Sequence, residues 1–115
     1  MYVLGFQGSP RLKANTYDLL SAVLTALRDK GAQTEMIHAS RVRVEPCRGC
    51  GFCEKKGYCA ISGDDMTDQL YPKLRRADLV ILASPVYFYN VPAQMKAIID
   101  RTQTLWARKY RHGLD

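Results

Sequence analysis

All four cysteines of the chain lie within thirteen residues. They are Cys47, Cys50, Cys53 and Cys59, in the spacing C-x2-C-x2-C-x5-C. Disulfide frameworks usually spread cysteines along a chain, so that each bridge closes a useful loop. Thiolates this close in sequence are instead typical of side chains that converge on one soft metal centre. The spacing therefore indicates metal ligation rather than cross-linking.

Three interpretations of this cysteine segment remain open. Structural zinc sites usually separate two C-x2-C pairs by a dozen or more residues. Bacterial ferredoxins use three cysteines at x2 spacing and a fourth slightly further on, which is closer to this pattern. Gly49, Gly51 and Gly57 suit a backbone that wraps a cluster, because glycine accepts positive φ angles. An iron–sulfur cluster is favoured, with structural zinc or free reduced thiols as the alternatives.

A second motif, GSPRLKANT, occupies residues 8–16. It follows an apolar run and leads into a helical pattern, so helix N-terminal amide groups lie next to polar side chains. The side chains suited to an anion are those of Ser9, Arg11, Asn15 and Thr16. The motif is neither a Walker loop nor a G-x-G-x-x-G fingerprint. It predicts an anion site, with a polar turn before a capped helix as the alternative.

A third motif, SPVYFYNVP, occupies residues 84–92 and follows the most apolar run of the sequence. Its three consecutive aromatic residues, Tyr87, Phe88 and Tyr89, lie between two prolines that stiffen the loop. Open parallel sheets bind their ligands at the carboxyl ends of the strands. The motif predicts rings that lie against a flat heterocycle, with packing in a core or an interface as the alternative.

Strands and helices must alternate along the chain to position these motifs. Apolar runs predict strands over residues 1–7, 34–38 and 77–84. Apolar residues three or four apart predict a helix capped by Asn15 and a single last helix that begins at Pro92. Pro72 should kink or split the helix that follows the cysteines. This order predicts an α/β fold with a parallel sheet and right-handed crossovers.

Length and composition limit the remaining possibilities. The 115 residues are expected to form a single domain, residues 1–115, with an inserted cysteine-rich loop over residues 44–62. The absence of a membrane-length apolar run or a signal-peptide pattern, together with metal-binding thiols, predicts a cytoplasmic protein without membrane partners. The net charge of +6 lacks the aromatic–basic interleaving of a nucleic-acid surface, so no nucleic-acid partner is expected.

Together, the three motifs resemble the iron–sulfur flavoprotein family. The matching stretches are GSPRLKANT, CRGCGFCEKKGYC followed by DDM, and ADLVILASPVYFYNVPAQMKAIIDR, in the family's order. That family belongs to the flavodoxin-like NAD(P)H-dependent FMN reductases. The resemblance implies a flavodoxin-like, three-layer α/β fold, a bound FMN, and a [4Fe–4S] cluster that exchanges electrons with the flavin.

The resemblance also implies a role for particular residues. The FMN phosphate would be held by Ser9, Arg11, Asn15 and Thr16. The isoalloxazine and ribityl chain would be lined by Pro85, Val86, Tyr87, Phe88 and Asn90. The cluster would be ligated by Cys47, Cys50, Cys53 and Cys59. No side chain of the motifs is a persuasive general acid or base, so no catalytic residue is predicted.

The family's parallel sheet has five strands in the order 2-1-3-4-5, and this chain is expected to supply only the first three, in the order 2-1-3. The third strand would then present a bare apolar edge, which we expect another subunit or a C-terminal segment to cover. The implied partners are a redox partner such as a ferredoxin or NAD(P)H, and further copies of the chain in a homo-oligomer. Ala14 stands where the family often has glycine.

Two other functions fit the same residues. One is an NAD(P)H-dependent FMN or quinone reductase without a cluster. The other is a degenerate metal-binding or interaction module that has lost flavin binding.

Overall fold

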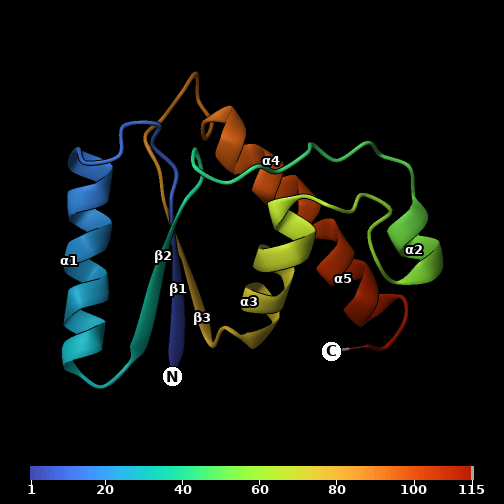
Figure 1. Ribbon diagram of the computed structural model, residues 1–115, viewed down its shortest axis with the longest axis horizontal. Coiled ribbons are helices and arrows are strands. Elements are labelled where there is room, and N and C mark those ends of the chain that lie inside the picture. The colour runs from blue at the N-terminus through green and yellow to red at the C-terminus, as the bar shows by residue number, and fades with distance from the viewer. Residues whose placement is uncertain (115) are drawn as a thin grey trace.

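A three-stranded parallel sheet with helices on both faces forms the centre of the computed structural model, which describes residues 1–114 (Figure 1). The strands are β1 (Tyr2–Gln7), β2 (Gln33–His38) and β3 (Leu79–Ala83). Both outer strands pair with β1 in parallel, and Val3 lies opposite Thr34 on one side and Leu79 on the other. The predicted α/β class and the strand order 2-1-3 are confirmed.

Helices separate into two layers around this sheet. They are α1 (Asn15–Asp29), α2 (Phe52–Lys56), the π-helical turn η1 (Met66–Leu70), α3 (Tyr71–Arg76), α4 (Ala93–Arg101) and α5 (Gln103–Tyr110). Figure 1 shows α1 on one face of the sheet and α3 and α4 on the other, with α5 and α2 further from the strands. Within residues 1–114, no helix is long and apolar enough to cross a membrane.

Every residue of β1 is buried, because both of its faces are covered. On the α1 side, Val3 packs with Leu20 and Leu24. The larger cluster on the opposite side contains Tyr2, Leu4, Phe6, Ile37, Ala39, Met66, Leu70, Met95 and Ile98. Successive side chains of a strand point to opposite faces, so one short strand supplies both cores.

The outer edge of β3 is apolar and exposed. Among residues 1–114, no further strand pairs with it, and Leu79, Val80 and Leu82 are all exposed. The predicted bare edge is thus present in this structure. Its covering by another subunit or segment stays a prediction.

Pro72 affects the helix after the cysteines as predicted. Proline lacks an amide donor, and here the helix divides into η1 and α3, with Pro72 in the first turn of α3. The Tyr71 N–H donates to Met66 O, five residues back, which is the wide π pattern. The extra residue in this turn accommodates the missing donor.

The prediction of a single last helix was wrong. The helix ends at Arg101, and a second helix, α5, begins at Gln103. Between them, the Thr102 hydroxyl donates to Ile99 O at 2.6 Å. A threonine hydroxyl that bonds to the preceding turn competes with the helical pattern and bends it. The break sends α5 toward the cysteine segment.

Candidate functional site

The loops that follow β1 and β3 enclose a cavity of about 210 Å³, here called the strand-end cavity. Its walls are Ser9, Arg11, Ala14, Asn15, Thr16, Pro85 and Tyr87. Figure 1 shows both loops at the same end of the sheet, where the strands finish. Six of the nine residues predicted to contact FMN therefore line one cavity.

Close approach of the two loops depends on Gly8. Its N–H donates to Ala83 O at 2.8 Å, which ties the loop after β1 to the end of β3. A Cβ atom at this position would lie 2.7 Å from Met95 Sδ and 3.1 Å from Ala83 O. Glycine thus permits an approach that a larger residue would push apart.

The conformation of the first loop is set by Gln7, a fully buried residue that sequence reasoning missed. Gln7 Oε1 accepts the Ser9 N–H, and Gln7 Nε2 donates to Arg11 O at 3.1 Å. Ser9 Oγ in turn accepts the Arg11 N–H at 3.1 Å. The signal in the sequence was a polar residue at the end of an otherwise apolar strand. These bonds hold the backbone in place and leave the Arg11 side chain exposed at the cavity.

The first turn of α1 borders the strand-end cavity. The residue before the helix is Ala14, which makes no side-chain cap, so the prediction that Asn15 caps the helix was wrong. Asn15 is instead the first helical residue and lines the cavity. Ala14 has a φ of −136°, an extended conformation that does not require glycine. The helix N-terminus gives this side of the cavity a preference for negative charge.

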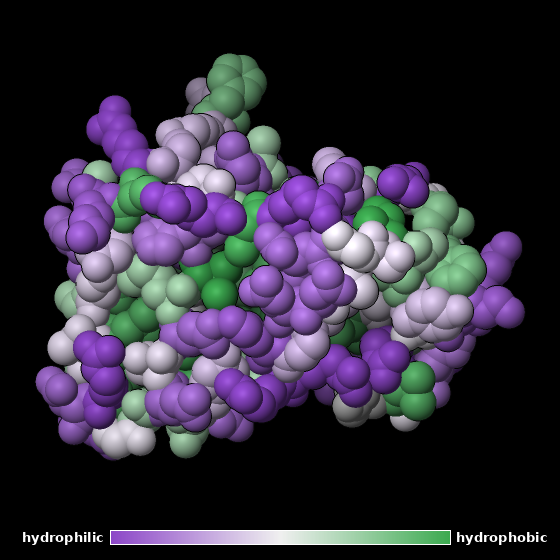
Figure 2. Space-filling view, in the orientation of Figure 1, coloured by the Kyte–Doolittle hydropathy of each residue, from purple (hydrophilic) through white to green (hydrophobic). Residues whose placement is uncertain are grey.

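A tight turn at Phe88 and Tyr89 lies within the loop after β3. The N–H of Tyr87 donates to Asn90 O at 2.7 Å, and the N–H of Asn90 donates to Tyr87 O at 3.0 Å. The two residues between them have φ angles of +48° and +66°, a region that bulky side chains rarely adopt. Their side chains are 95% and 93% exposed. Figure 2 shows the loop at this end of the molecule projecting from the surface.

Three of the predicted FMN contacts lie outside the strand-end cavity. Val86 and Phe88 are exposed. Asn90 Oδ1 accepts the Val91 N–H at 2.8 Å, so its carboxamide supports the turn. The roles of these three residues toward a flavin stay predictions.

The four cysteines line a second cavity, of about 70 Å³, here called the cysteine cavity. It lies between the cysteine segment and the junction of α4 and α5. Cys47 and Cys50 are exposed, Cys53 and Cys59 are partly buried, and all four are free thiols. Across residues 1–114, no three His, Cys, Asp or Glu side chains are gathered closely enough to hold a metal ion. The donor set fits an iron–sulfur cluster, although the thiols lie around the cavity without converging.

Glycines shape the backbone around these thiols as the sequence predicted. The φ angles of Gly49, Gly51 and Gly57 are +65°, +72° and +82°. The last two flank α2, the short helix that carries Cys53. The Gly49 N–H donates to Cys47 Sγ at 3.5 Å. Backbone donors aimed at sulfur adjust the reduction potential of a bound cluster.

A buried ion pair fastens both ends of the cysteine segment to α4. Arg101 Nη1 lies 2.7 Å from Asp64 Oδ2, and both side chains are almost completely buried. The same nitrogen donates to Glu45 O at 2.7 Å, and Nη2 donates to Thr67 Oγ1 at 3.2 Å. One guanidinium thereby joins the residues before the cysteines to those after them.

Both members of this pair are charged at neutral pH. Burial alone would raise the pKa of Asp64, but hydrogen bonds from Arg101 and from the N–H groups of Glu45 and Thr67 lower it to about 2. Burial works against the charge of Arg101, whereas its bonds to Asp64 and Tyr71 raise its pKa. Sequence reasoning missed the pair. The signal was an arginine three residues after Ile98 on the apolar face of α4.

Residues of α5 and the turn after it hold the helix that carries Cys53. Arg108 Nη1 donates to Gly57 O at 3.0 Å. His112 Nε2 lies 2.8 Å from Glu54 O, a carbonyl oxygen to which it can only donate. The break at Thr102 therefore has a structural consequence, because it brings α5 against α2.

Comparison with known sequences agrees with this geometry. Residues 1–112 match the family described as NADPH-dependent FMN reductase. The chain is 38% identical to an iron–sulfur flavoprotein of Methanosarcina thermophila, over 96% of this chain and 56% of the relative. It is 46% identical to an iron–sulfur flavoprotein of Archaeoglobus fulgidus, over 88% of this chain and 45% of the relative. The chain spans about half the length of the curated relatives it matches, and the predicted resemblance is confirmed.

Solved structures with the same architecture include two oxidoreductases. An NAD(P)H:quinone oxidoreductase from Methanothermobacter marburgensis superposes with a TM-score of 0.70 at 21% identity, covering 88% of this chain and 52% of that one. A flavone reductase gives a TM-score of 0.66 at 22% identity, covering 89% of this chain and 30% of that one. At these identities the similarity concerns the fold, and it confirms the predicted flavodoxin-like class.

Proposed function

Because the chain belongs to the NADPH-dependent FMN reductase family, we propose that it forms the FMN- and cluster-binding part of an oxidoreductase. Bound FMN would supply one- and two-electron chemistry at the strand-end cavity, and a [4Fe–4S] cluster would supply one-electron chemistry at the cysteine cavity. The observation that carries the proposal is that six of the nine residues predicted to contact FMN line one cavity, while all four cysteines line another.

In this proposal, the loop after β1 holds the FMN phosphate. The first turn of α1 offers backbone amides and a favourable dipole. The planar guanidinium of Arg11 can donate two parallel hydrogen bonds to phosphate oxygens. The side chains of Asn15 and Thr16 line the same cavity and add polar groups. Gln7 acts indirectly, since it fixes the backbone on which these groups are carried.

The loop after β3 would contact the flavin ring. The residues concerned are Pro85, Val86, Tyr87, Phe88 and Asn90. The left-handed backbone of the turn supports this role, because strain of this kind clusters at ligand sites. The exposed rings of Phe88 and Tyr89 offer apolar faces that a flat heterocycle would cover.

The cluster would be ligated by Cys47, Cys50, Cys53 and Cys59, which share one cavity. The names of the relatives support this assignment, since they are iron–sulfur flavoproteins. The buried pair of Arg101 and Asp64 would hold the ligand segment in place. Arg101 is the last residue of α4, whose first residue, Ala93, directly follows the loop after β3.

The partners of this oxidoreductase are part of the proposal. A ferredoxin or NAD(P)H would exchange electrons with it in a cytoplasmic setting. A second copy of the chain, or a C-terminal segment, would cover the apolar edge of β3.

Two matched variants test the proposal on protein prepared without oxygen. Cys50→Ser should remove iron and labile sulfide and leave FMN bound, because only the cysteine cavity contains Cys50. Arg11→Gln should weaken FMN binding by about tenfold, the loss expected for one charge-assisted phosphate contact, and leave the iron content unchanged. Loss of both cofactors in either variant, or wild-type protein lacking both, would contradict the proposal.

A reductase without a cluster is the second candidate. It is favoured by the thiols of residues 1–114, which line a cavity but are not gathered into a metal site. FMN bound without labile sulfide would support this candidate. Iron without flavin would instead support a metal-binding module that has lost flavin binding.

A further inference from the structure

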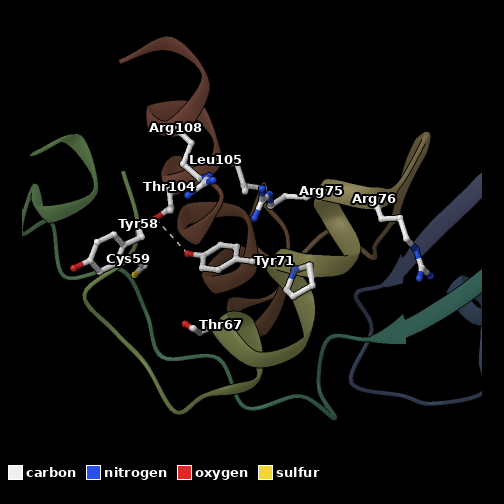
Figure 3. A pocket seen from close by; sticks show the side chains of 10 residues that line it. Tyr58, Cys59, Thr67, Tyr71, Arg75, Arg76, Thr104, Leu105 and Arg108 are labelled. Carbon is white, nitrogen blue, oxygen red and sulfur yellow. Dashed lines mark hydrogen bonds between the residues drawn. The ribbon is translucent and has the colours of Figure 1, made fainter. Parts of the chain in front are cut away.

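Several partly buried polar side chains of this chain hold backbone that is distant in sequence. In the cavity of about 550 Å³ between α3 and α5, the Tyr71 hydroxyl donates to Arg101 O at 2.8 Å and lies 3.3 Å from Thr104 Oγ1 (Figure 3). These contacts tie α3 to the junction of α4 and α5. A comparable group at the loop after β1 contains His38, whose imidazole is of the kind that changes charge near neutral pH.

The loop after β1 fixes the orientation of the Gln7 carboxamide. The Ser9 N–H can only donate, so the Gln7 atom that faces it must be Oε1. The Arg11 carbonyl can only accept, so the Gln7 atom that faces it, at 3.1 Å, must be Nε2. A flipped carboxamide would place two donors together at Ser9 and two acceptors together at Arg11. Both loop bonds therefore exist in only one orientation of this side chain.

His38 accepts the second N–H of the same carboxamide. Its Nδ1 lies 3.4 Å from Gln7 Nε2, and the two residues lie opposite each other in the register of β1 and β2. Because Gln7 Nε2 is a donor, Nδ1 must offer a lone pair, which the neutral imidazole does when its proton is on Nε2. Gln7 is fully buried, so loss of this acceptor leaves an N–H without a partner and away from water.

The groups around His38 keep a constant charge near neutral pH. His38 is partly buried and lines a groove of about 360 Å³ between α1 and β2. Its ring stacks on that of Tyr17, with centroids 6.0 Å apart, and phenols stay neutral below pH 8. Among the described residues that line the groove, the one permanent charge is that of Arg28, and Arg41 in the turn after β2 donates its N–H to His38 O at 2.9 Å. A proton gained here near neutral pH would thus belong to His38.

We propose that His38 is a positioning residue for the loop after β1 and makes this loop sensitive to pH. Neutral His38 accepts from Gln7, which in turn holds Ser9 and Arg11. A proton on Nδ1 turns the acceptor into a donor that faces another donor, and the carboxamide cannot flip without losing both loop bonds. The loop then opens, and its affinity for a phosphate monoester falls. That this monoester is FMN rests on the proposed function, whereas control of the loop by His38 does not.

Amide exchange in the flavin-free full chain, measured by NMR at pH 7.5 and 5.5, tests this proposal. His38→Asn keeps an acceptor, Oδ1, near the place of Nδ1 but takes up no proton in this range. His38→Phe keeps a ring against Tyr17 but has no acceptor. At pH 7.5, the N–H groups of Ser9 and Arg11 should be equally protected in wild type and His38→Asn, and about tenfold less protected in His38→Phe.

At pH 5.5, protection of these two N–H groups should fall about tenfold in the wild type and should not fall in His38→Asn. Comparison of chains at one pH removes the effect of pH on exchange itself. The control is the Asp78 N–H, which donates to Tyr2 O at 2.9 Å at the other end of the sheet and should respond to neither variant. Equal protection of wild type and His38→Asn at pH 5.5 would overturn the proposal. So would an equal loss at Asp78, because His38 would then stabilise the whole sheet.

FMN titrations at both pH values connect the loop to the proposed function. A phosphate monoester itself gains a proton in this range, so the loss of affinity is compared between wild type and His38→Asn. The wild type should lose about tenfold more affinity than the variant. Equal losses would overturn the proposal. Exchange as expected in a chain that binds no FMN would support control of the loop by His38 and refute the proposed function.

Discussion

Backbone pairing positions the strand-end cavity, whereas side chains position the cysteine cavity. At the strand ends, the parallel ladder and the Gly8 to Ala83 hydrogen bond bring two loops together. Around the cysteines, the chain lacks such a ladder, and Arg101, Arg108 and His112 hold it through bonds to distant residues. The first site thus shares the stability of the sheet, and the second depends on a few contacts that single substitutions can remove.

Replacement of Arg101 should have the largest effect and should separate the two sites. In Arg101→Met, the carboxylate of Asp64 is left buried without its partner, which costs about 3–5 kcal/mol of unfolding free energy. Chemical denaturation measures this loss, and iron content should fall with it. In the double variant Arg101→Met/Asp64→Asn, much of the loss should be recovered, because the unpaired charge is gone.

Lys96→Gln supplies the control on the same helix. Lys96 and Asp100 form an exposed i,i+4 pair, so its removal should cost about 0.5 kcal/mol or less. If Lys96→Gln lowered the unfolding free energy as much as Arg101→Met does, any damage to α4 would have the same effect. The result would then contradict a special role of the buried pair in holding the cysteine segment.

Acid should weaken the buried pair next. The pKa of Asp64 is about 2 in the folded chain, below its ordinary value of 3.8, so this carboxyl stabilises the fold above about pH 4. The contribution, about 2 kcal/mol, should disappear as the pH falls from about 4 through 2. Unfolding free energies measured across this range should decline, and Asp64→Asn should remove that part of the decline. An unchanged pH profile in Asp64→Asn would contradict the assignment.

Relief of the strained turn in the loop after β3 should have a smaller effect on the unfolding free energy, and this effect should be stabilising. Asparagine and glycine suit positive φ angles in a two-residue turn, so Phe88→Asn/Tyr89→Gly should raise the unfolding free energy by about 1 kcal/mol. The same variant should lose affinity for FMN in a fluorescence titration, because it removes both exposed rings. Stabilisation with unchanged FMN affinity would show that the rings serve another purpose.

A substitution at the exposed edge of β3 should have the smallest effect on the unfolding free energy. Leu82 is half exposed, so Leu82→Lys should change the unfolding free energy of the single chain by about 0.5 kcal/mol or less. If a second copy covers the edge, the charge should shift light scattering toward the monomer mass. The same mass for wild type and variant would argue against that covering.

Features encoded within a short stretch of sequence were predictable. The apolar runs predicted the three strands, the family resemblance implied their order, and the cysteine spacing identified residues that do share a cavity. The positive φ angles of Gly49, Gly51 and Gly57 also followed from sequence, because a backbone that wraps a cluster was expected to need the φ angles that glycine accepts. Motifs that follow parallel strands meet at one edge of a sheet, so the strand-end cavity could be anticipated as well.

Features that depend on distant partners were not predictable. Arg101 and Asp64 are separated by 37 residues, and His112 and Glu54 by 58. A single sequence shows that an arginine lies on an apolar helix face, but it does not name the carboxylate that pairs with it. The break at Thr102 was missed because a hydroxyl can bond to the preceding turn or face solvent with little difference in sequence pattern.

Paramagnetic resonance of the anaerobically prepared, dithionite-reduced chain tests the central claim most directly. The claim is that the thiols of the cysteine cavity hold a [4Fe–4S] cluster while the strand-end cavity holds FMN. The account predicts the signal of a reduced cluster in the wild type and its loss in Cys50→Ser, with FMN retained in both. A wild-type sample that contains FMN but gives no cluster signal would contradict it.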